Sequence, residues 1–310
     1  MESIIHTPIL LIGFNRPDVI KESFEYIRKA KPQKLYVAID GPRKEKEGES
    51  KLVEEVRTIV KQVDWHCQTH YKFHVENLGA ELSVSSAITW VLETEETVIV
   101  LEDDIIAPMA FLRFAQEMLE RYSNNENIYM VSSNQWTPFQ IPNDEDYLFG
   151  VYGHSWGWAT WRRAWSRFDL HIGDFSDILS NHKIHSLVNS KNELWYWKNL
   201  IRSMQERGRG NNTWDYCWVY IRFKERGLSI IPKYNLTSNI GAFGLHAKGV
   251  TEHHFRPFKE DFVAYRHPEK VVRNIEYDMH HLDTYLMKPY SLMVRIKILV
   301  KRCLKVLRLR

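Results

Sequence analysis

Glu102-Asp103-Asp104 is the stretch of this sequence whose residue types and spacing are best suited to chemistry. Three adjacent carboxylates repel one another, so a divalent cation or a set of hydrogen-bond donors must offset their charge. Clustered oxygen ligands suit Mg²⁺ or Mn²⁺. Alternation along an extended segment points Glu102 and Asp104 one way and Asp103 the other, so one or two can bind metal while the third holds a neighbouring group. A solvated acidic turn is the alternative interpretation.

Two other polar segments also follow apolar runs directly. Asn15-Arg16 comes after residues 8–14, and Asp40-Gly41 comes after residues 35–39, just as the acidic triplet comes after residues 98–101. In parallel sheets, ligands bind beyond the carboxyl ends of the strands. We therefore expect these three segments to border one site.

The elements that must position these segments alternate along the first 135 residues. Hydrophobic spacing predicts strands at 8–14, 35–39, 71–75, 98–101 and 128–132, a helix capped by Asp18, and helices at 52–63, 80–92 and 111–122. Residues 44–50 are expected to form a charged surface loop. Continuous apolar strands that alternate with helices indicate an α/β fold, with a mostly parallel sheet flanked by helices.

The chain changes character after Asn134. Eight tryptophans lie between residues 156 and 218, and residues 150–161 are rich in glycine and aromatic residues. We expect a single domain over 1–288, with a ligand-binding half at 1–134, an aromatic-rich half at 135–288, and a basic tail at 289–310. Core packing is the expected role of Trp161 and Trp165.

Composition and motifs exclude several classes of protein. The chain is 44% hydrophobic and 26% charged, which is typical of a globular protein, and its three cysteines are too few for a disulfide framework. A net charge of +3 gives no indication of nucleic-acid binding. The glycine-rich phosphate loops of dinucleotide-binding and P-loop enzymes are missing from the sequence. A bound nucleotide diphosphate would therefore need a metal to neutralise it.

Four short motifs follow one another along the chain: Pro8-Ile9-Leu10 with Asn15-Arg16-Pro17, then Ala38-Ile39-Asp40-Gly41, then Asn77-Leu78-Gly79, then Leu101-Glu102-Asp103-Asp104. Their order resembles bacterial GT-A fold glycosyltransferases, most closely the N-acetylglucosaminyltransferase I type, whose metal motif is also Glu-Asp-Asp. The similarity covers about residues 8 to 245. The resemblance implies a GT-A-like fold, with a nucleotide-sugar-binding first half and an acceptor-binding second half.

The resemblance also implies roles for individual residues. Arg16 and Asp40 match positions that hold the base and ribose, usually of UDP, and Asn15 and Gly79 belong to the same nucleotide-sugar site. Glu102 and Asp103 match positions near the ribose and donor sugar, and Asp104 matches the carboxylate that binds Mn²⁺. Residues 150–161 resemble the Gly-Leu-Gly-Trp region near the donor sugar. Trp156 and Trp158 are accordingly expected to stack on sugar faces.

Inverting transfer needs a base for the acceptor hydroxyl. Residues 214–218 resemble the Trp-Asp-Asp-Trp segment that supplies this base, but one residue is inserted here and the second aspartate is absent. Asp215 is the candidate base. A helix N-cap is its alternative role, and Asp174 and Asp177 are alternative bases.

Residues 239–246 form a glycine-hinged loop that ends in a histidine. Such a loop could close over a diphosphate, with His246 binding metal or phosphate and Lys248 adding positive charge. A structural role is the alternative for His246. The pairs 253–254 and 280–281, both His-His, are expected to be surface residues.

The basic residues are distributed unevenly. Seven of them, and no acidic residue, lie between Tyr290 and Arg310, so the remainder carries a net charge of −4. On a helical wheel the tail has one apolar face, formed by Leu292, Ile296, Leu299, Val300, Cys303, Leu304 and Leu307, and one basic face. The pattern fits a helix lying in an anionic membrane surface. A terminal helix packed on the domain or on a partner is the alternative.

These observations favour a metal-dependent inverting glycosyltransferase that uses a UDP-sugar and Mn²⁺ or Mg²⁺. Its acceptor would be a hydroxyl of a glycan or glycolipid in surface polysaccharide synthesis. No signal peptide or membrane span is recognisable, so we expect a cytoplasmic protein, peripheral on the inner face of a bacterial membrane if its tail binds lipid. The alternatives are a sugar-nucleotide nucleotidyltransferase and a non-catalytic carbohydrate-binding protein.

Overall fold

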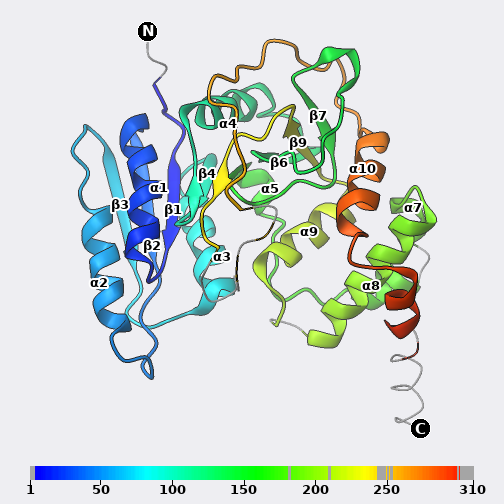
Figure 1. Ribbon diagram of the computed structural model, residues 1–310, viewed down its shortest axis with the longest axis horizontal. Coiled ribbons are helices and arrows are strands. Elements are labelled where there is room, and N and C mark those ends of the chain that lie inside the picture. The colour runs from blue at the N-terminus through cyan, green and yellow to red at the C-terminus, as the bar shows by residue number, and fades with distance from the viewer. Residues whose placement is uncertain are drawn as a thin grey trace.

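The computed structural model describes residues 4–180, 183–208, 211–242, 249, 251, 254–298 and 300. The first half contains β1 (Ile9–Gly13), α1 (Pro17–Ala30), β2 (Lys34–Ile39), α2 (Glu49–Val60), β3 (Gln68–Phe73), α3 (Gly79–Leu92), β4 (Thr97–Glu102), β5 (Ile105–Ile106), α4 (Met109–Arg121) and β6 (Ile128–Ser132). The expected strands and helices of this half are therefore confirmed, with small shifts at their ends. Figure 1 shows these elements from blue to green.

The second half adds strands to the same sheet and a group of helices beside it. Its elements are β7 (Tyr147–Gly150), β8 (Trp158–Trp161), α5 (Arg162–Trp165), α6 (Phe175–Ser180), α7 (Lys183–Leu187), α8 (Lys191–Arg207), α9 (Trp214–Lys224), β9 (Leu228–Pro232), β10 (Ser238–Asn239) and α10 (Ile275–His281). Helices α7 to α10 gather at one end of the sheet (Figure 1).

One eight-stranded sheet joins the two halves. Its strand order is β3-β2-β1-β4-β8-β6-β9-β7, and β7 and β8 run antiparallel to their neighbours while the other strands are parallel. The expected mostly parallel sheet is confirmed. Because β8 lies between β4 and β6, a strand from the second half sits in the middle of the sheet, directly beside the strand that carries the acidic triplet.

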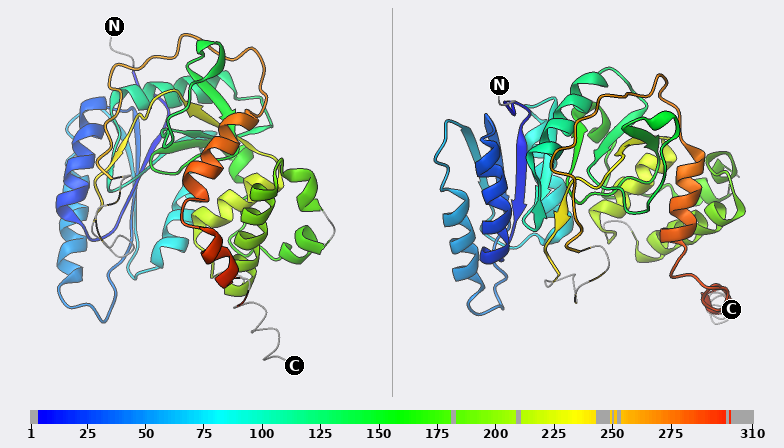
Figure 2. Two further views of the ribbon diagram at one scale, coloured as in Figure 1. Left: turned by 45° about the vertical axis from the view of Figure 1, so that its right-hand side comes forward. Right: turned by 45° about the horizontal axis from the view of Figure 1, so that its top comes forward.

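Helices cover both faces of the sheet. Helices α1 and α2 pack on each other beside β1 to β3, whereas α3 packs against β1, β2 and β4. Figure 2 shows α1 and α2 on one side of these strands and α3 on the other. Every residue of β1 is buried, and β2 and β4 are buried except at their ends, which explains their apolar sequences. The edge strand β3 is exposed or half-buried along its length and is largely polar.

Two local expectations are wrong. Helix α1 begins at Pro17, and the residue that precedes it, Arg16, makes no side-chain cap; Asp18 lies inside the first turn. The charged segment 44–50 does not stay a surface loop to its end, because α2 begins at Glu49. The Glu49 side chain is buried and accepts hydrogen bonds from Arg43 and Asn15, which offset the cost of burying its charge.

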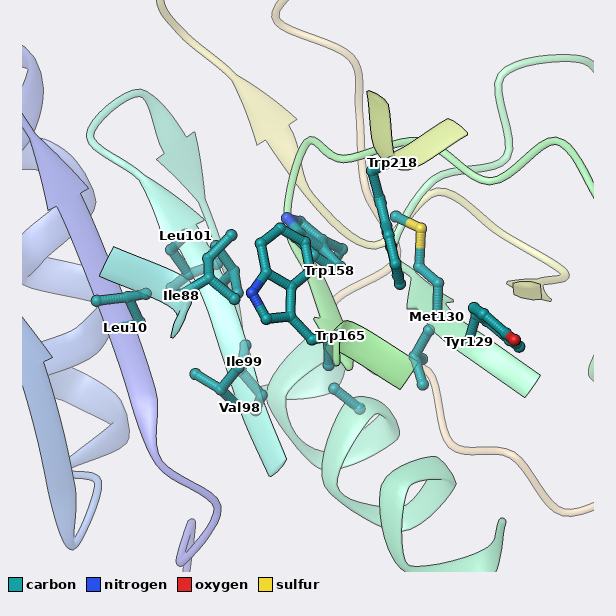
Figure 3. Close-up of a cluster of buried hydrophobic side chains, with 14 of the residues drawn as sticks. Leu10, Ile88, Val98, Ile99, Leu101, Tyr129, Met130, Trp158, Trp165 and Trp218 are labelled. Atoms are coloured by element: carbon teal, nitrogen blue, oxygen red, sulfur yellow. The ribbon is translucent and has the colours of Figure 1, made fainter. Parts of the chain in front are cut away.

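Tryptophans fill the core beneath β8. Trp158 is fully buried, and its ring lies 6.0 Å from that of Trp165 and 6.1 Å from that of Trp218. Figure 3 shows Trp158 and Trp165 beside the aliphatic side chains of β4, and Trp218 beyond them near Met130. Trp161 and Trp165 are core residues as expected.

A buried ionic network fixes the second half. Arg273 donates to Glu193 in the first turn of α8 and to Asp278 in α10, and both carboxylates are completely buried. Asp278 also accepts hydrogen bonds from the Val151 amide, and Glu193 from the Tyr152 hydroxyl. The network ties α8 and α10 to the segment after β7 that leads to Trp156.

The tail is described only in its first part. Residues 292–298 and residue 300 are helical, and Leu292, Met293, Ile296 and Val300 are exposed. Arg295 donates a hydrogen bond to Asn192 in α8 and lies 5.0 Å from the Trp195 ring. Leu299, Cys303, Leu304 and Leu307, four of the seven residues of the expected apolar face, lie outside the described residues.

Candidate active site

A cavity of about 710 Å³ opens at the carboxyl ends of β1, β2 and β4, which is within the range of small-molecule sites. Its walls come from both halves of the chain. The first half supplies residues 12–16, Asp40, Asn77, the start of α3 and the acidic triplet, and the second half supplies Trp136, Trp156, Asn239, Gly241, Gly249, Thr251, His254 and Tyr285. The three polar segments expected to border one site therefore do so.

Arg16 is the centre of the acidic triplet's interactions. Glu102 ends β4, and Asp103 and Asp104 form the turn that leads into β5. The Arg16 guanidinium forms an ion pair with Asp103 through Nε and Nη2, and Nη2 also donates to Asp104 at 2.9 Å. One cation thus faces three carboxylates.

This imbalance of charge changes the protonation of the site. Burial, followed by repulsion from Asp104, Asp103 and Asp215, raises the pKa of Glu102 to about 8. Burial also raises the pKa of Asp103 to about 6 against the opposing effect of Arg16. Burial would lower the pKa of Arg16, but the two aspartates raise it above its ordinary value. The site therefore has an unmet demand for positive charge.

Asp40 organises the wall beside α3. Its carboxylate accepts hydrogen bonds from the backbone amides of Gly41, Leu78 and Gly79, and from the side-chain amide of Asn77 at 2.9 Å. Burial raises the pKa of Asp40, and these backbone donors oppose the increase. Asp40 lines the cavity, but protein donors occupy its carboxylate, so its demonstrated contacts hold the turn that begins α3.

The backbone of residues 238–241 closes the site beside the triplet. Strand β10 pairs with β5, and the Ile240 amide donates to the carbonyl of Asp104. Gly241 passes so close to Asp104 that an added Cβ would lie 2.0 Å from its Oδ2. Only glycine fits this approach without displacing the carboxylate. His246 and Lys248, which the sequence places next, lie outside the described residues.

An aromatic wall faces the cavity from the second half. The Trp136 ring lies 4.8 Å from Trp156 and 5.1 Å from Tyr285, and His254 lies 5.4 Å from Trp156. Trp156 is thus placed at the cavity as expected. Trp158 is not: its side chain is fully buried in the core (Figure 3), so it cannot stack on a sugar in this structure.

Sequence reasoning missed Trp136 and Tyr285, which no motif marks because their importance arises from contacts between segments far apart in the chain. It singled out the loop that contains Gly241, but not the close approach of Gly241 to Asp104. It also misplaced His281, which is not a surface residue: its side chain is completely buried and its Nε2 lies 3.1 Å from that of His154. His254 lines the cavity.

Asp215 lies in the first turn of α9, near but not among the cavity-lining residues. It is close enough to Glu102 to contribute to the raised pKa of that residue, after burial and the two neighbouring aspartates. Thr213, not Asp215, precedes the helix, so the alternative role of N-cap is wrong. Of the other two candidate bases, Asp174 accepts hydrogen bonds from Tyr220 and Lys224, and Asp177 is exposed.

The carboxylate oxygens of the site can bind a hard divalent cation if substrate oxygens supply its remaining ligands. Within the described residues, no group of three or more His, Cys, Asp or Glu side chains is arranged to hold a metal. Mg²⁺-type sites, however, commonly use one or two carboxylates together with substrate phosphates. Asp104 lines the cavity and its side chain is 14% exposed, so it can serve as such a carboxylate.

Comparisons with known proteins give only weak similarities. No protein-family model matches the chain, and no curated protein sequence matches it. Among solved structures, the mannosyltransferase PcManGT from Pyrobaculum calidifontis, in complex with GDP-Man and Mn²⁺, is 11% identical with a TM-score of 0.37, over 72% of this chain and 70% of that chain.

Two other solved structures are similarly distant. A 4-diphosphocytidyl-2C-methyl-D-erythritol synthase from Anaerococcus prevotii is 10% identical with a TM-score of 0.33, over 70% of this chain and 99% of that chain. HddC from Yersinia pseudotuberculosis is 9% identical with a TM-score of 0.32, over 51% and 77%. All these scores are below 0.5, so the similarities support no conclusion about function. The N-acetylglucosaminyltransferase I resemblance and a bacterial origin stay predictions.

The raised pKa values predict that the metal-free protein loses stability as the pH rises. A folded-state pKa of about 8 for Glu102, against an ordinary value near 4.5, means that the folded state keeps a proton that the unfolded state has lost. As the pH rises from about 4.5 to about 8, the contribution of Glu102 to the free energy of unfolding therefore decreases, by at most about 1.4 kcal/mol per pH unit. In chelator, Glu102→Gln should lose less stability than the parent from pH 6 to 8 in denaturant unfolding.

Glu47→Gln is the matched control, because Glu47 is exposed. It should reproduce the parent's pH dependence. An equal dependence in parent and Glu102→Gln would contradict the raised pKa of Glu102.

Proposed function

We propose that the protein is a metal-dependent glycosyltransferase that transfers a sugar from a nucleotide-diphosphate sugar, with UDP as the expected nucleotide. The observation that carries the proposal is the cavity itself. Arg16, Asp40 and the acidic triplet converge there from the ends of three neighbouring parallel strands, and an aromatic wall faces the same cavity. A polar, acidic end and an aromatic end suit a metal-bound diphosphate and a sugar, respectively.

Each part of the cavity has a proposed role. Asp104 would hold Mn²⁺ or Mg²⁺ together with diphosphate oxygens, and His246 is the second proposed ligand from the sequence. Such a cation stabilises the charge that develops on a departing diphosphate. Asn15, Arg16, Asp40, Gly79, Glu102 and Asp103 would border the nucleotide and sugar, and Trp156 would offer its ring to a sugar face.

The acceptor is proposed to be a hydroxyl of a glycan or glycolipid, and Asp215 the base of an inverting reaction. Asp215 is half-buried and adjacent to the acidic end of the cavity through its interaction with Glu102. A base must lie within hydrogen-bond reach of the acceptor hydroxyl, a geometry that often tightens only when substrate binds.

A nucleotidyltransferase is less well supported. Such an enzyme neutralises a nucleoside triphosphate with several basic side chains near the first strand. Among the described cavity-lining residues, Arg16 is the sole arginine or lysine. A purely carbohydrate-binding protein would have no use for the buried carboxylates at the other end.

Asp104→Ala should abolish Mn²⁺-dependent binding of UDP, because it removes the carboxylate proposed to hold the metal. Calorimetric titration of UDP with and without Mn²⁺ measures this, and the same titration with CTP tests the nucleotidyltransferase. Asp18→Ala, at an exposed aspartate in α1, should bind UDP as the parent does. Equal affinity for UDP in the presence of Mn²⁺ in the parent and in Asp104→Ala would show that Asp104 does not bind the metal.

Asp215→Asn should lower the rate of sugar transfer on the order of 10²–10⁴-fold, since it keeps the side-chain shape but removes the proton acceptor. Donor binding should be retained. Donor candidates are first identified by mass-spectrometric screening of UDP-sugar hydrolysis. Asp18→Asn is the matched control, at an exposed aspartate that does not line the cavity. Transfer at the parent rate by Asp215→Asn would show that Asp215 is not the base.

We also propose that the tail holds the protein on an anionic membrane surface, close to a lipid-linked acceptor. Its described helix exposes Leu292, Met293 and Ile296, and the sequence continues with basic residues. Each basic residue near such a surface contributes about 1 kcal/mol. No helix in the described ranges is long and apolar enough to span a membrane, so attachment would be peripheral.

Replacing Lys297, Lys301, Lys305 and Arg308 with glutamine should release the protein from anionic vesicles, while Arg295, which contacts α8, is left in place. Co-sedimentation with phosphatidylserine vesicles measures binding, which should also weaken as salt rises. UDP affinity should stay unchanged. Equal sedimentation of variant and parent would favour a tail that packs on protein.

A further inference from the structure

Arg16 is held where it can reach only a few groups. It lies between the end of β1 and Pro17, the first residue of α1. A helical conformation is disfavoured for the residue before a proline, and Arg16 is accordingly non-helical, with φ −115° and ψ 78°. Its side chain runs from there to the turn after β4.

The two aspartates of that turn are bound unequally. Asp103 receives both Nε and Nη2 of Arg16, and its side chain is 6% exposed. Asp104 receives one hydrogen bond, from the same Nη2, and its side chain is 14% exposed. The guanidinium can therefore release Asp104 and keep both of its donor atoms on Asp103.

Asp104 also lies against a second segment of the site, the backbone at Gly241. The backbone at Gly241 lies against its Oδ2, the atom that Arg16 contacts. Arg16 lines the same cavity. A cation that approaches Asp104 from the cavity thus meets an oxygen already paired with a positive charge.

We propose that Arg16 is a built-in counter-ion of the Asp103–Asp104 turn, and that a divalent cation binds Asp104 only by displacing the Arg16 guanidinium from it. The proposal rests on the proposed function, because it takes Asp104 as a metal-binding carboxylate. Arg16 therefore weakens the binding of metal alone. A diphosphate, which supplies further oxygens to the metal, restores tight binding, so metal and nucleotide bind cooperatively.

The test is the affinity for Mn²⁺ in the absence of nucleotide, measured by calorimetry and by the electron paramagnetic resonance of free Mn²⁺. Removing one competing charge-assisted hydrogen bond should tighten Mn²⁺ binding about tenfold in Arg16→Gln. Arg43→Gln is the matched control, because Arg43 pairs with Glu49 instead of the triplet, and its Mn²⁺ affinity should equal the parent's.

A second variant guards against loss of folding. Arg16→Gln leaves Asp103 buried without its partner, whereas Arg16→Gln combined with Asp103→Asn removes both charges and still frees Asp104. This double variant should also bind Mn²⁺ more tightly than the parent.

The possible failures are distinguishable. If the parent binds Mn²⁺ and UDP through Asp104, but neither Arg16 variant tightens binding of Mn²⁺ alone, the counter-ion role is overturned and the proposed function stands. If the parent binds no Mn²⁺ even with UDP, both proposals are overturned.

Discussion

The clustering of three adjacent carboxylates opposite one guanidinium is the constraint on which the site depends. Asp103 is buried, and Glu102 and Asp104 are half-buried at the end of β4, so their desolvation and mutual repulsion create a demand for positive charge. Arg16 supplies one charge from the end of β1, and Gly241 removes any side chain that would crowd Asp104. The arrangement keeps the acidic turn folded and leaves it in need of a second cation.

The order of the strands in the sheet explains why the cavity has an acidic end and an aromatic end. Strand β8 inserts between β4 and β6, so the aromatic segment that precedes it arrives beside the acidic turn. The network of Glu193, Arg273 and Asp278 then anchors the helices of the second half to the loop leading into that segment. Both halves of the chain therefore line one cavity because their strands form a single sheet.

Much of the first half could be predicted from the sequence, since β1, β2, β4 and β6 are mainly apolar and the helices carry their own periodicity. The convergence of Asn15, Arg16, Asp40 and the triplet also followed from one rule about strand ends. The aromatic side of the cavity could not be predicted, because it depends on contacts between distant segments that local sequence patterns do not encode. Trp136 lines the cavity from a segment outside any strand, whereas Trp158 fills the core from within β8, and this difference arises from tertiary contacts.

The central claim is that Asp104 binds a metal that also binds a nucleotide diphosphate in this cavity. A crystal structure of the protein grown with Mn²⁺ and UDP, with anomalous data that locate manganese, tests it most directly. The account predicts one manganese bound to Asp104 and to diphosphate oxygens, with the Arg16 guanidinium still on Asp103 but moved off Asp104. UDP bound elsewhere, or bound in the cavity with no manganese at Asp104, would contradict it.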